Sequence, residues 1–482
     1  MKIRAIVLLM TLVLGNIAHA ENLTQENVKK AKGIIDEAVA AYGGKKLLSS
    51  MNTVIIENET INIASGQSLK PEPPWDRNPS TGISAVDFKN KIFVTRNHGT
   101  AVGFVFDNGT IINAEKSAQL DFRAGTVAAI TAPDFDTSSG PFMRVTPALL
   151  VRQLHDRSQN AYYLGETNIE GQDYDVVGFS MAVGPALSLY FERESRLLRR
   201  SERVLQDFGL VEYRFNNYEK VSNIPFNKEF ALYLNGDLNI ERKNLKTQVN
   251  VSIDDLTLVD PKLTKIEAIV PDELSRQEVA KGIYHIGGNG TYAMFIEMQD
   301  YVIAVGGTSG SSQRIEKLRE VIPEKPIKYG VITHHHFDHV IAVSAYEAEG
   351  ATVLASTAHR AVVKKAAKDA DNLKLKTVGD KKVLKDKSRR VEIIDIGPTA
   401  HTEHLLVAYL PEEGILFEAD HFSMPQAGPV APAVPSTITF ASALKKHRIK
   451  AKKFLSAHSP RVGTQEDLHE AITKELWGNK SD

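Results

Sequence analysis

A short polar motif that follows an apolar run constrains this chain more than any other feature of its sequence. Directly after Val331-Ile332-Thr333, four strong metal-binding side chains occur within six residues: His334, His336, Asp338 and His339. Imidazole and carboxylate together suit zinc, iron or manganese, and a loop at a strand end can direct alternate side chains to one point. The motif therefore predicts a metal site at the end of a β-strand and favours a hydrolase.

The same arrangement recurs later in the chain. His401 follows a strand predicted over residues 390–396, Asp420 ends the run 414–419, and His458 ends the run 453–457. Predicted strands also alternate with predicted helices after about residue 280, which indicates α/β layers. The carboxyl ends of strands in open α/β sheets are where binding sites form. We therefore expect these side chains to converge with those of the first motif.

From about Lys265 to the C-terminus, these motifs resemble the metallo-β-lactamase fold, an αββα sandwich with a dinuclear metal site. The resemblance implies two divalent metal ions, zinc with iron or manganese as alternatives. It implies three sets of ligands: His334, His336 and His401 for the first ion, Asp338, His339 and His458 for the second, and Asp420 as a bridge between them. Two such ions can share a hydroxide that acts as the nucleophile. Asp338 and Asp420 are the expected catalytic residues.

The bridging position and the lack of cysteine narrow the chemistry. Zinc β-lactamases of this family generally lack a bridging aspartate, and some use a cysteine ligand, whereas this chain has Asp420 and no cysteine. Asp420 instead resembles the glyoxalase II, lactonase and phosphodiesterase branches. The first hypothesis is therefore cleavage of an ester, lactone, thioester or phosphodiester. The alternatives are a carrier of an apolar ligand with a structural metal site and, third, a β-lactamase.

Two departures from the family pattern and three further histidines concern the surroundings of the site. Val340-Ile341-Ala342 stands where a Gly-Gly pair is common, and Val305-Gly306-Gly307 lacks a common aspartate. His335 points away from its neighbours in an extended loop, so we expect it outside the ligand set. His404 competes with His401 for the third ligand position, where the His-Thr dipeptide favours His401. His421 is expected either behind the ligands or facing the substrate.

The N-terminal half predicts a different architecture. Apolar residues from Val28 to Tyr42 recur at helical spacing, and short strand-like runs from Val54 to Leu258 predict an antiparallel meander with a loop over residues 65–82. A turn is predicted at Asp107-Asn108-Gly109-Thr110. His98 and His155 are expected to be structural. One helix followed by a curved antiparallel sheet resembles periplasmic lipoprotein-carrier folds, whose concave face would hold an apolar ligand.

Length and the first residues complete the expected organisation. The chain has 482 residues, too many for one typical core, and its net charge of -1 gives no electrostatic reason to expect nucleic acid as a partner. Lys2 and Arg4, the apolar run 5–14 and Ala18-His19-Ala20 predict a signal peptide cleaved after Ala20, without a membrane span. We expect a periplasmic or secreted protein that acts on an apolar or anionic small molecule. Its predicted parts are a signal peptide (1–20), a β-rich α+β domain (21–262) and an α/β hydrolase domain (263–482).

Overall fold

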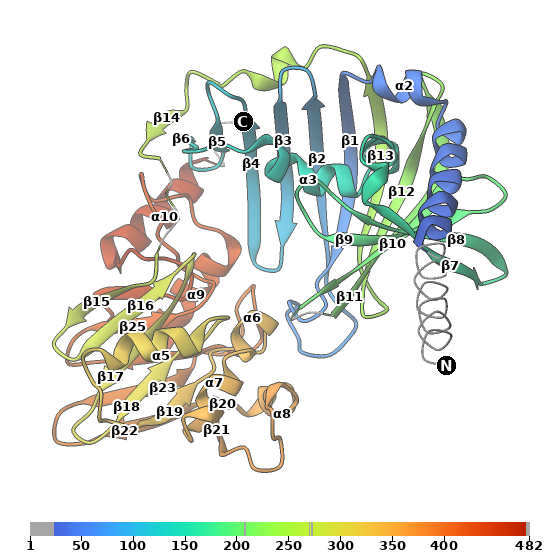
Figure 1. Ribbon diagram of the computed structural model, residues 1–482. Helices are drawn as coiled ribbons and strands as arrows, with labels where there is room; N and C mark the ends of the chain where they lie inside the picture. The colour runs from blue at the N-terminus through green and yellow to red at the C-terminus, as the bar shows by residue number, and fades with distance from the viewer. Residues whose placement is uncertain (1–23, 207–208, 269, 271–272, 479–482) are drawn as a thin grey trace, which may run out of the picture.

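The computed structural model describes residues 24–206, 209–268, 270 and 273–478, and these residues form three β-sheets with helices on their faces (Figure 1). The predicted signal peptide, residues 1–20, lies outside the described residues. None of the helices in the described part of the chain has the length and apolarity needed to span a membrane. The first sheet and the helices that pack on it are here called the N-terminal region. The other two sheets and their helices are called the C-terminal region.

The N-terminal region is one sheet of 14 strands in the order β14-β6-β5-β4-β3-β2-β1-β13-β12-β11-β10-β9-β8-β7. Neighbouring strands are antiparallel except for β14, which runs parallel to β6. β1 pairs with both β2 and β13, so the first and last long strands meet in the middle of the sheet. The strands are β1 (Thr53–Ile63), β2 (Arg77–Asp87), β3 (Ile92–Ala101), β4 (Phe104–Ile112), β5 (Ala118–Asp121), β6 (Thr126–Ala129), β7 (Ala161–Ile169), β8 (Gln172–Ser180), β9 (Ala186–Glu192), β10 (Leu198–Leu205), β11 (Gly209–Val221), β12 (Ile224–Leu234), β13 (Asp237–Val249) and β14 (Thr264–Ile266).

Helices cover one face of this sheet. The predicted helix is confirmed over residues 24–41, and α2 (Lys45–Ser49), α3 (Phe135–Arg144) and α4 (Pro147–Asp156) follow it. Apolar side chains of the long helix, α3 and α4 pack with those of the sheet in one core, which includes Tyr42, Leu150 and Phe215. Because these helices fill much of the face, the open concave surface expected for an apolar ligand is largely covered. Two short 3-10 helices, η1 (Ser158–Asn160) and η2 (Asp254–Thr257), complete the region.

The structure corrects three predictions for the N-terminal region. The meander is interrupted by α3 and α4, and His155 therefore lies in a helix; Gly140 and Pro141 inside α3 weaken its helical pattern. The predicted turn around Asn108-Gly109 is wrong, because β4 runs through it. A Cβ at Gly109 would lie 2.7 Å from Arg96 Nη1, so this glycine makes room for a crossing side chain. The predicted loop 65–82 is shorter than expected, because β2 begins at Arg77.

The C-terminal region contains two smaller sheets. One has the order β15 to β21 and the other β22 to β27, each in sequence order. The strands are β15 (Ser275–Ala280), β16 (Ile283–Gly288), β17 (Thr291–Glu297), β18 (Val302–Val305), β19 (Ile327–Val331), β20 (Thr352–Ser356), β21 (Leu375–Val378), β22 (Lys381–Lys385), β23 (Arg390–Asp395), β24 (Leu406–Leu410), β25 (Ile415–Glu418), β26 (Lys453–Ser456) and β27 (Gly463–Thr464). The helices are α5 (Ser311–Arg319), α6 (Phe337–Val340), α7 (Val343–Ala348), η3 (Thr357–His359), α8 (Arg360–Ala366), α9 (Pro435–Lys446) and α10 (Gln465–Gly478).

Apolar side chains of the two sheets share a core that includes Ile303, Ile393 and Phe417. A second apolar cluster joins the first sheet to α5 and α7, and a third joins the other sheet to α9 and α10. The change from the N-terminal sheet to the C-terminal sheets falls between β14 and β15, so residues 264–266 still belong to the N-terminal sheet. The strands predicted to precede the candidate ligands are β19, β23, β25 and β26.

Candidate metal centre

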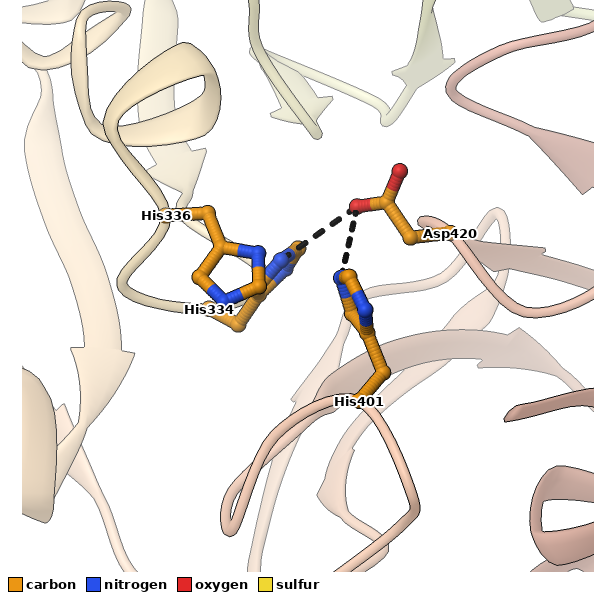
Figure 2. Close-up of side chains that lie close together, drawn as sticks. All are labelled: His334, His336, His401 and Asp420. Carbon is orange, nitrogen blue, oxygen red and sulfur yellow. Dashed lines mark ion pairs between the residues drawn. The ribbon is translucent and has the colours of Figure 1, made fainter. Parts of the chain in front are cut away.

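Loops that follow four strands of the C-terminal region bring all of the predicted ligands together. The side chains come from the loop after β19, from α6, and from the loops after β23, β25 and β26: His334, His336, Asp338, His339, His401, Asp420 and His458. They form two groups, and within each group the potential ligand atoms lie within 4.8 Å of one another. The first group is His334, His336, His401 and Asp420, and the second is Asp338, His339 and His458. Figure 2 shows the side chains of the first group turned toward one another.

The Asp420 carboxylate lies between the two groups. Its Oδ2 is 3.3 Å from His334 Nε2 and 3.6 Å from His401 Nε2, the two ion pairs dashed in Figure 2. The same oxygen is 2.7 Å from His339 Nε2, and Oδ1 is 2.9 Å from His458 Nε2. Asp420 also has a φ of 64°, a left-handed conformation that is uncommon for residues other than glycine and recurs at functional sites. One carboxylate thus reaches both groups.

Histidines of the first group present a lone pair to the centre. His336 donates Nε2–H to the Ser68 carbonyl at 2.9 Å, and His401 donates Nδ1–H to the Val102 carbonyl at 2.7 Å. A carbonyl can only accept, so the other nitrogen of each neutral ring keeps its lone pair. Those nitrogens, His336 Nδ1 and His401 Nε2, are buried and have no hydrogen-bond partner among the described residues, and neither has His334 Nε2.

The rings of the second group are also held by backbone carbonyls, here from other residues. His339 Nδ1 lies 3.2 Å from the Gly307 carbonyl, and His458 Nδ1 lies 3.3 Å from the Gly290 carbonyl. The Nε2 atoms of both rings face the carboxylates. Asp338 Oδ2 is 3.5 Å from His339 Nε2 and 3.8 Å from His458 Nε2. Each ring is therefore held from outside by a backbone carbonyl and directs its other nitrogen inward.

This arrangement fits divalent metal ions. A buried polar atom without a partner costs about 1–3 kcal/mol, so three such nitrogens aimed at one space call for a ligand that accepts their lone pairs. Five imidazoles and two carboxylates are a donor set that suits zinc, iron or manganese. Metal-binding histidines characteristically donate their other ring N–H to a carbonyl or carboxylate, as these do.

Burial and nearby charges set the protonation of several of the candidate ligands. Burial, with the nearby imidazoles, holds the pKa of His334 and of His336 well below 6.5, so both rings are neutral at neutral pH. Burial alone would raise the pKa of Asp420. The charges of His339 and His458 outweigh this effect, so the net pKa lies well below 3.8. Burial lowers the pKa of His458, but Asp420 and Asp338 outweigh this and raise it to about 9. A metal ion must therefore displace a proton from His458.

The site opens on the side of the second group. The side chains of His334 and His401 are 0% and 5% exposed, whereas those of His458 and Asp338 are 28% and 32% exposed. Phe337, next to Asp338, is 44% exposed. A small molecule would approach the centre from this side.

The remaining histidines near the site do not join either group. His335 is buried, with Nε2 2.9 Å from the Ser68 carbonyl and Nδ1 3.4 Å from the Thr402 hydroxyl. His404 contacts the Asp395 carboxylate at 2.9 Å, and of the two competing histidines only His401 lies in the first group. His421 is buried, and its ring packs edge-on against that of His401 with Nε2 2.8 Å from Thr399 Oγ1.

The 305–307 segment, which lacks the common aspartate, lies against one of the candidate ligands. In this segment the Gly307 carbonyl oxygen lies 3.2 Å from His339 Nδ1. A Cβ at Gly307 would lie 2.2 Å from the Ala342 methyl group, so glycine is required where α6 and α7 approach this strand end. The segments 305–307 and 340–342 are thus in close contact.

Several residues that shape the site escaped the sequence analysis. Ser68 and Val102 act through backbone carbonyls, which no side-chain pattern reveals. Gln67 donates from Nε2 to Asp338 Oδ1 at 2.6 Å. Glu418 is fully buried behind Asp420, where burial raises its pKa to about 7 and its carboxylate accepts the His421 N–H at 2.8 Å. Its place at the end of β25, two residues before Asp420, was the one available signal.

Comparison with known proteins identifies the fold around the site. Residues 286–458 match the model of the metallo-beta-lactamase superfamily. Over these residues the C-terminal region is similar to metallo-β-lactamase superfamily domains. Members of this superfamily are generally metal-dependent hydrolases and usually bind divalent metal ions. No curated protein sequence matches the chain.

Several solved structures resemble a part of the chain at low sequence identity. A metallo-beta-lactamase from Pontibacter korlensis is 17% identical, with 42% of this chain and 99% of that chain covered and a TM-score of 0.34. One from Hirschia baltica is 18% identical, with 42% and 97% covered and a TM-score of 0.33. The flavodiiron protein from Giardia intestinalis is 17% identical, with 44% and 61% covered and a TM-score of 0.34.

Proposed function

We propose that this protein is an exported, dinuclear metal-dependent hydrolase that cleaves an ester, lactone, thioester or phosphodiester in a small molecule. The proposal includes a signal peptide of residues 1–20, a β-rich domain over about 21–262 and an αββα hydrolase domain over about 263–482. The observation that carries it is the orientation of the histidines. Four rings are held from outside by backbone carbonyls, and their other nitrogens converge with His334 Nε2 on the Asp420 carboxylate.

The proposed ligands follow the two groups. His334, His336 and His401 would hold one ion, Asp338, His339 and His458 the other, and Asp420 would bridge them. Two divalent ions held there, zinc in the first instance, would supply the positive charge that lowers the pKa of a bound water and stabilises the oxygen that gains charge.

Two carboxylates have distinct roles in this proposal. Asp420 remains ionised because its pKa is held well below 3.8, so it keeps a negative charge between the two groups of ligands. Asp338 is the more exposed of the two, at 32% against 13%, and lies on the open side. This exposure supports a role for Asp338 in orienting the attacking water and accepting its proton.

A substrate panel tests this function. The zinc-loaded protein is assayed with activated esters, lactones, thioesters and phosphodiesters beside Asp420→Ala and a control, Ser117→Ala, whose site lies in the β4–β5 turn. We expect turnover of at least one class, lost in Asp420→Ala and retained in the control. Turnover that survives in Asp420→Ala would refute the proposed centre.

The same preparation separates the alternatives. A carrier would retain an apolar ligand in native mass spectrometry and show no turnover of any class. A β-lactamase would hydrolyse a chromogenic cephalosporin, which we do not expect.

A further inference from the structure

Two turns of the N-terminal sheet reach the metal centre of the C-terminal region. The β1–β2 loop, residues 64–76, accepts the Phe337 N–H on the Gly66 carbonyl at 3.0 Å and the Glu403 N–H on the Leu69 carbonyl at 3.1 Å. The β3–β4 turn, residues 102–103, accepts the Ser436 N–H on the Gly103 carbonyl at 2.9 Å. Backbone hydrogen bonds therefore fix the β1–β2 loop against the segments that carry His336 and His401, and the β3–β4 turn against the start of α9.

The histidines of the two groups differ in where the carbonyls that hold them come from. The carbonyls that hold the second group, Gly307 and Gly290, belong to the C-terminal region. Those that hold His336 and His401 in the first group, Ser68 and Val102, belong to the N-terminal region. The first group is thus completed only when the N-terminal sheet is in place.

We propose that the β1–β2 loop and the β3–β4 turn are working parts of the metal centre, which position His336 and His401 and set the affinity of the first metal position. This inference rests on the proposed function. The Ser68 and Val102 carbonyls fix which nitrogen of each ring carries the proton and hold the ring plane, so that the lone pairs meet. Partners of this kind typically contribute 10–100-fold to metal affinity.

Side-chain hydrogen bonds inside the β1–β2 loop hold its backbone in one conformation. Ser68 Oγ donates to the Ala64 carbonyl at 2.9 Å and accepts the Asp76 N–H at 2.8 Å, while Asp76 Oδ2 accepts the Leu69 N–H at 2.7 Å. The buried Ser68 side chain therefore closes the loop around its own carbonyl. Such a polar network holds that carbonyl at a fixed distance from His336.

Glycine at position 103 permits the close approach of the second turn. Gly103 has a φ of +81°, and a Cβ there would lie 3.0 Å from His401 Cβ and 3.1 Å from the Ala400 carbonyl oxygen. A methyl group would therefore strain the turn and push it away from His401, which lengthens the bond from His401 Nδ1 to the Val102 carbonyl.

One thermodynamic consequence follows. If docking of the two turns increases metal affinity, bound metal must stabilise that docking by the same free energy. Metal binding should therefore stabilise the docking of the N-terminal sheet on the C-terminal region, although the predicted ligands all lie in the latter.

The test compares two variants with matched controls in the full-length protein. Ser68→Ala opens the β1–β2 loop, and Gly103→Ala displaces the β3–β4 turn. Ser117→Ala removes an equivalent pair of hydrogen bonds, to the Asn113 carbonyl and from the Asn113 N–H, at the opposite end of β4. Gly171→Ala places a methyl group at a φ of +85° in the β7–β8 turn, where a Cβ meets nothing within 4 Å.

Metal-depleted proteins are titrated with Zn²⁺ in competition with a chromogenic chelator. We expect one of the two equivalents to bind 10–100-fold more weakly in Ser68→Ala and Gly103→Ala, and both equivalents to bind as in the wild type in the controls. Hydrogen exchange of the wild type should show slower exchange of amides in residues 64–76 and 101–104 when Zn²⁺ is added.

The outcomes distinguish the inference from the function on which it rests. If the wild type binds zinc and both variants bind it like their controls, the inference is overturned while the proposed function stands. Unchanged hydrogen exchange in the two turns also overturns it, and this readout needs no variant to fold. A wild type that binds no zinc overturns both.

Discussion

Two clusters of buried polar groups, one in the N-terminal sheet and one at the metal centre, are satisfied in opposite ways. In the N-terminal sheet, the buried carboxylates of Asp175 and Glu212 are each paired with two arginines. In the C-terminal region, the imidazoles of His334, His336 and His401 each keep one buried nitrogen without a hydrogen-bond partner among the described residues. The first arrangement is complete as it stands, whereas the second is complete only with a ligand.

This difference locates function better than sheet architecture does. A fully paired polar cluster stabilises or specifies a fold, and an unpaired one held rigidly from outside indicates a binding site. The boundary between the two regions crosses the site itself, because the carbonyls of Ser68 and Val102 belong to the N-terminal region and hold ligands of the C-terminal region. The predictions below test that division.

The largest effect is expected from removing the carboxylate that joins the two groups. Asp420→Ala should lower kcat/KM by about a thousandfold and lose bound zinc, because several kcal/mol of electrostatic stabilisation depend on it. Asp175→Asn, which changes a buried carboxylate in the N-terminal sheet, should keep both zinc and activity. Equal losses in the two variants would remove the contrast between the regions.

Zinc itself should stabilise the protein. At a free concentration about a hundred times the dissociation constant, each site adds about 3 kcal/mol to the free energy of unfolding. Thermal unfolding of metal-depleted and zinc-loaded protein measures this, and the midpoint should rise on loading. In Ser68→Ala the rise should be smaller. An identical rise in that variant would place the β1–β2 loop outside the centre.

Contacts between the regions that lie away from the ligands should affect stability alone. Arg123 donates to the Ala433 carbonyl at 3.0 Å and pairs with Glu475 at 3.2 Å, and its side chain is 18% exposed. Arg123→Ala should lower the free energy of unfolding by about 2 kcal/mol, measured with urea, because it removes hydrogen bonds to a partly buried charge. Zinc affinity should stay within about threefold of the wild type. A larger change would mean that any loosening of the interface disturbs the metal.

Gln67 should affect catalysis moderately, because it acts through Asp338. Its Nε2 holds Asp338 Oδ1, which leaves Oδ2 to face the second group. Gln67→Ala should lower kcat about tenfold with little change in KM, since orientation of the carboxylate is lost but substrate contacts are kept. Gln67→Asn should recover part of the loss only if its shorter amide still reaches Asp338. A rise in KM alone would instead assign Gln67 to substrate binding.

The smallest effect belongs to the N-terminal sheet and depends on pH. Burial alone would raise the pKa of Asp175. Hydrogen bonds and charges from Arg193 and Arg196 outweigh this effect, so the net pKa lies below the ordinary 3.8. The stabilisation is therefore present above pH 3.8 and is lost as the pH falls through the depressed pKa of the folded state. Asp175→Asn should cost about 1 kcal/mol at pH 7, a difference that narrows below about pH 3.8. A difference that is independent of pH would contradict this ion-pair account.

The sequence predicted the ligands well because each follows an apolar strand directly. The carboxyl ends of β19, β25 and β26 fix where His334, Asp420 and His458 project, so local order along the chain was sufficient. His401 required a choice against His404, which the structure places against Asp395 instead.

What the sequence could not reveal were contacts made by backbone atoms and by distant turns. Ser68 and Val102 contribute carbonyl oxygens, which every residue possesses, and they meet His336 and His401 across more than 260 positions of sequence. The same limit explains the turn wrongly predicted at Gly109, where glycine serves the crossing Arg96 side chain and not a change of direction. Local patterns identify side-chain chemistry, whereas tertiary contacts decide which backbone atoms support it.

The most direct test of the account is the zinc stoichiometry and affinity of the full-length wild type. Metal-depleted protein is titrated with Zn²⁺ against a chromogenic chelator, and bound metal is counted by elemental analysis after gel filtration. The account predicts two equivalents per chain, one of them weakened in both Ser68→Ala and Gly103→Ala. A protein that binds no zinc under these conditions would contradict it.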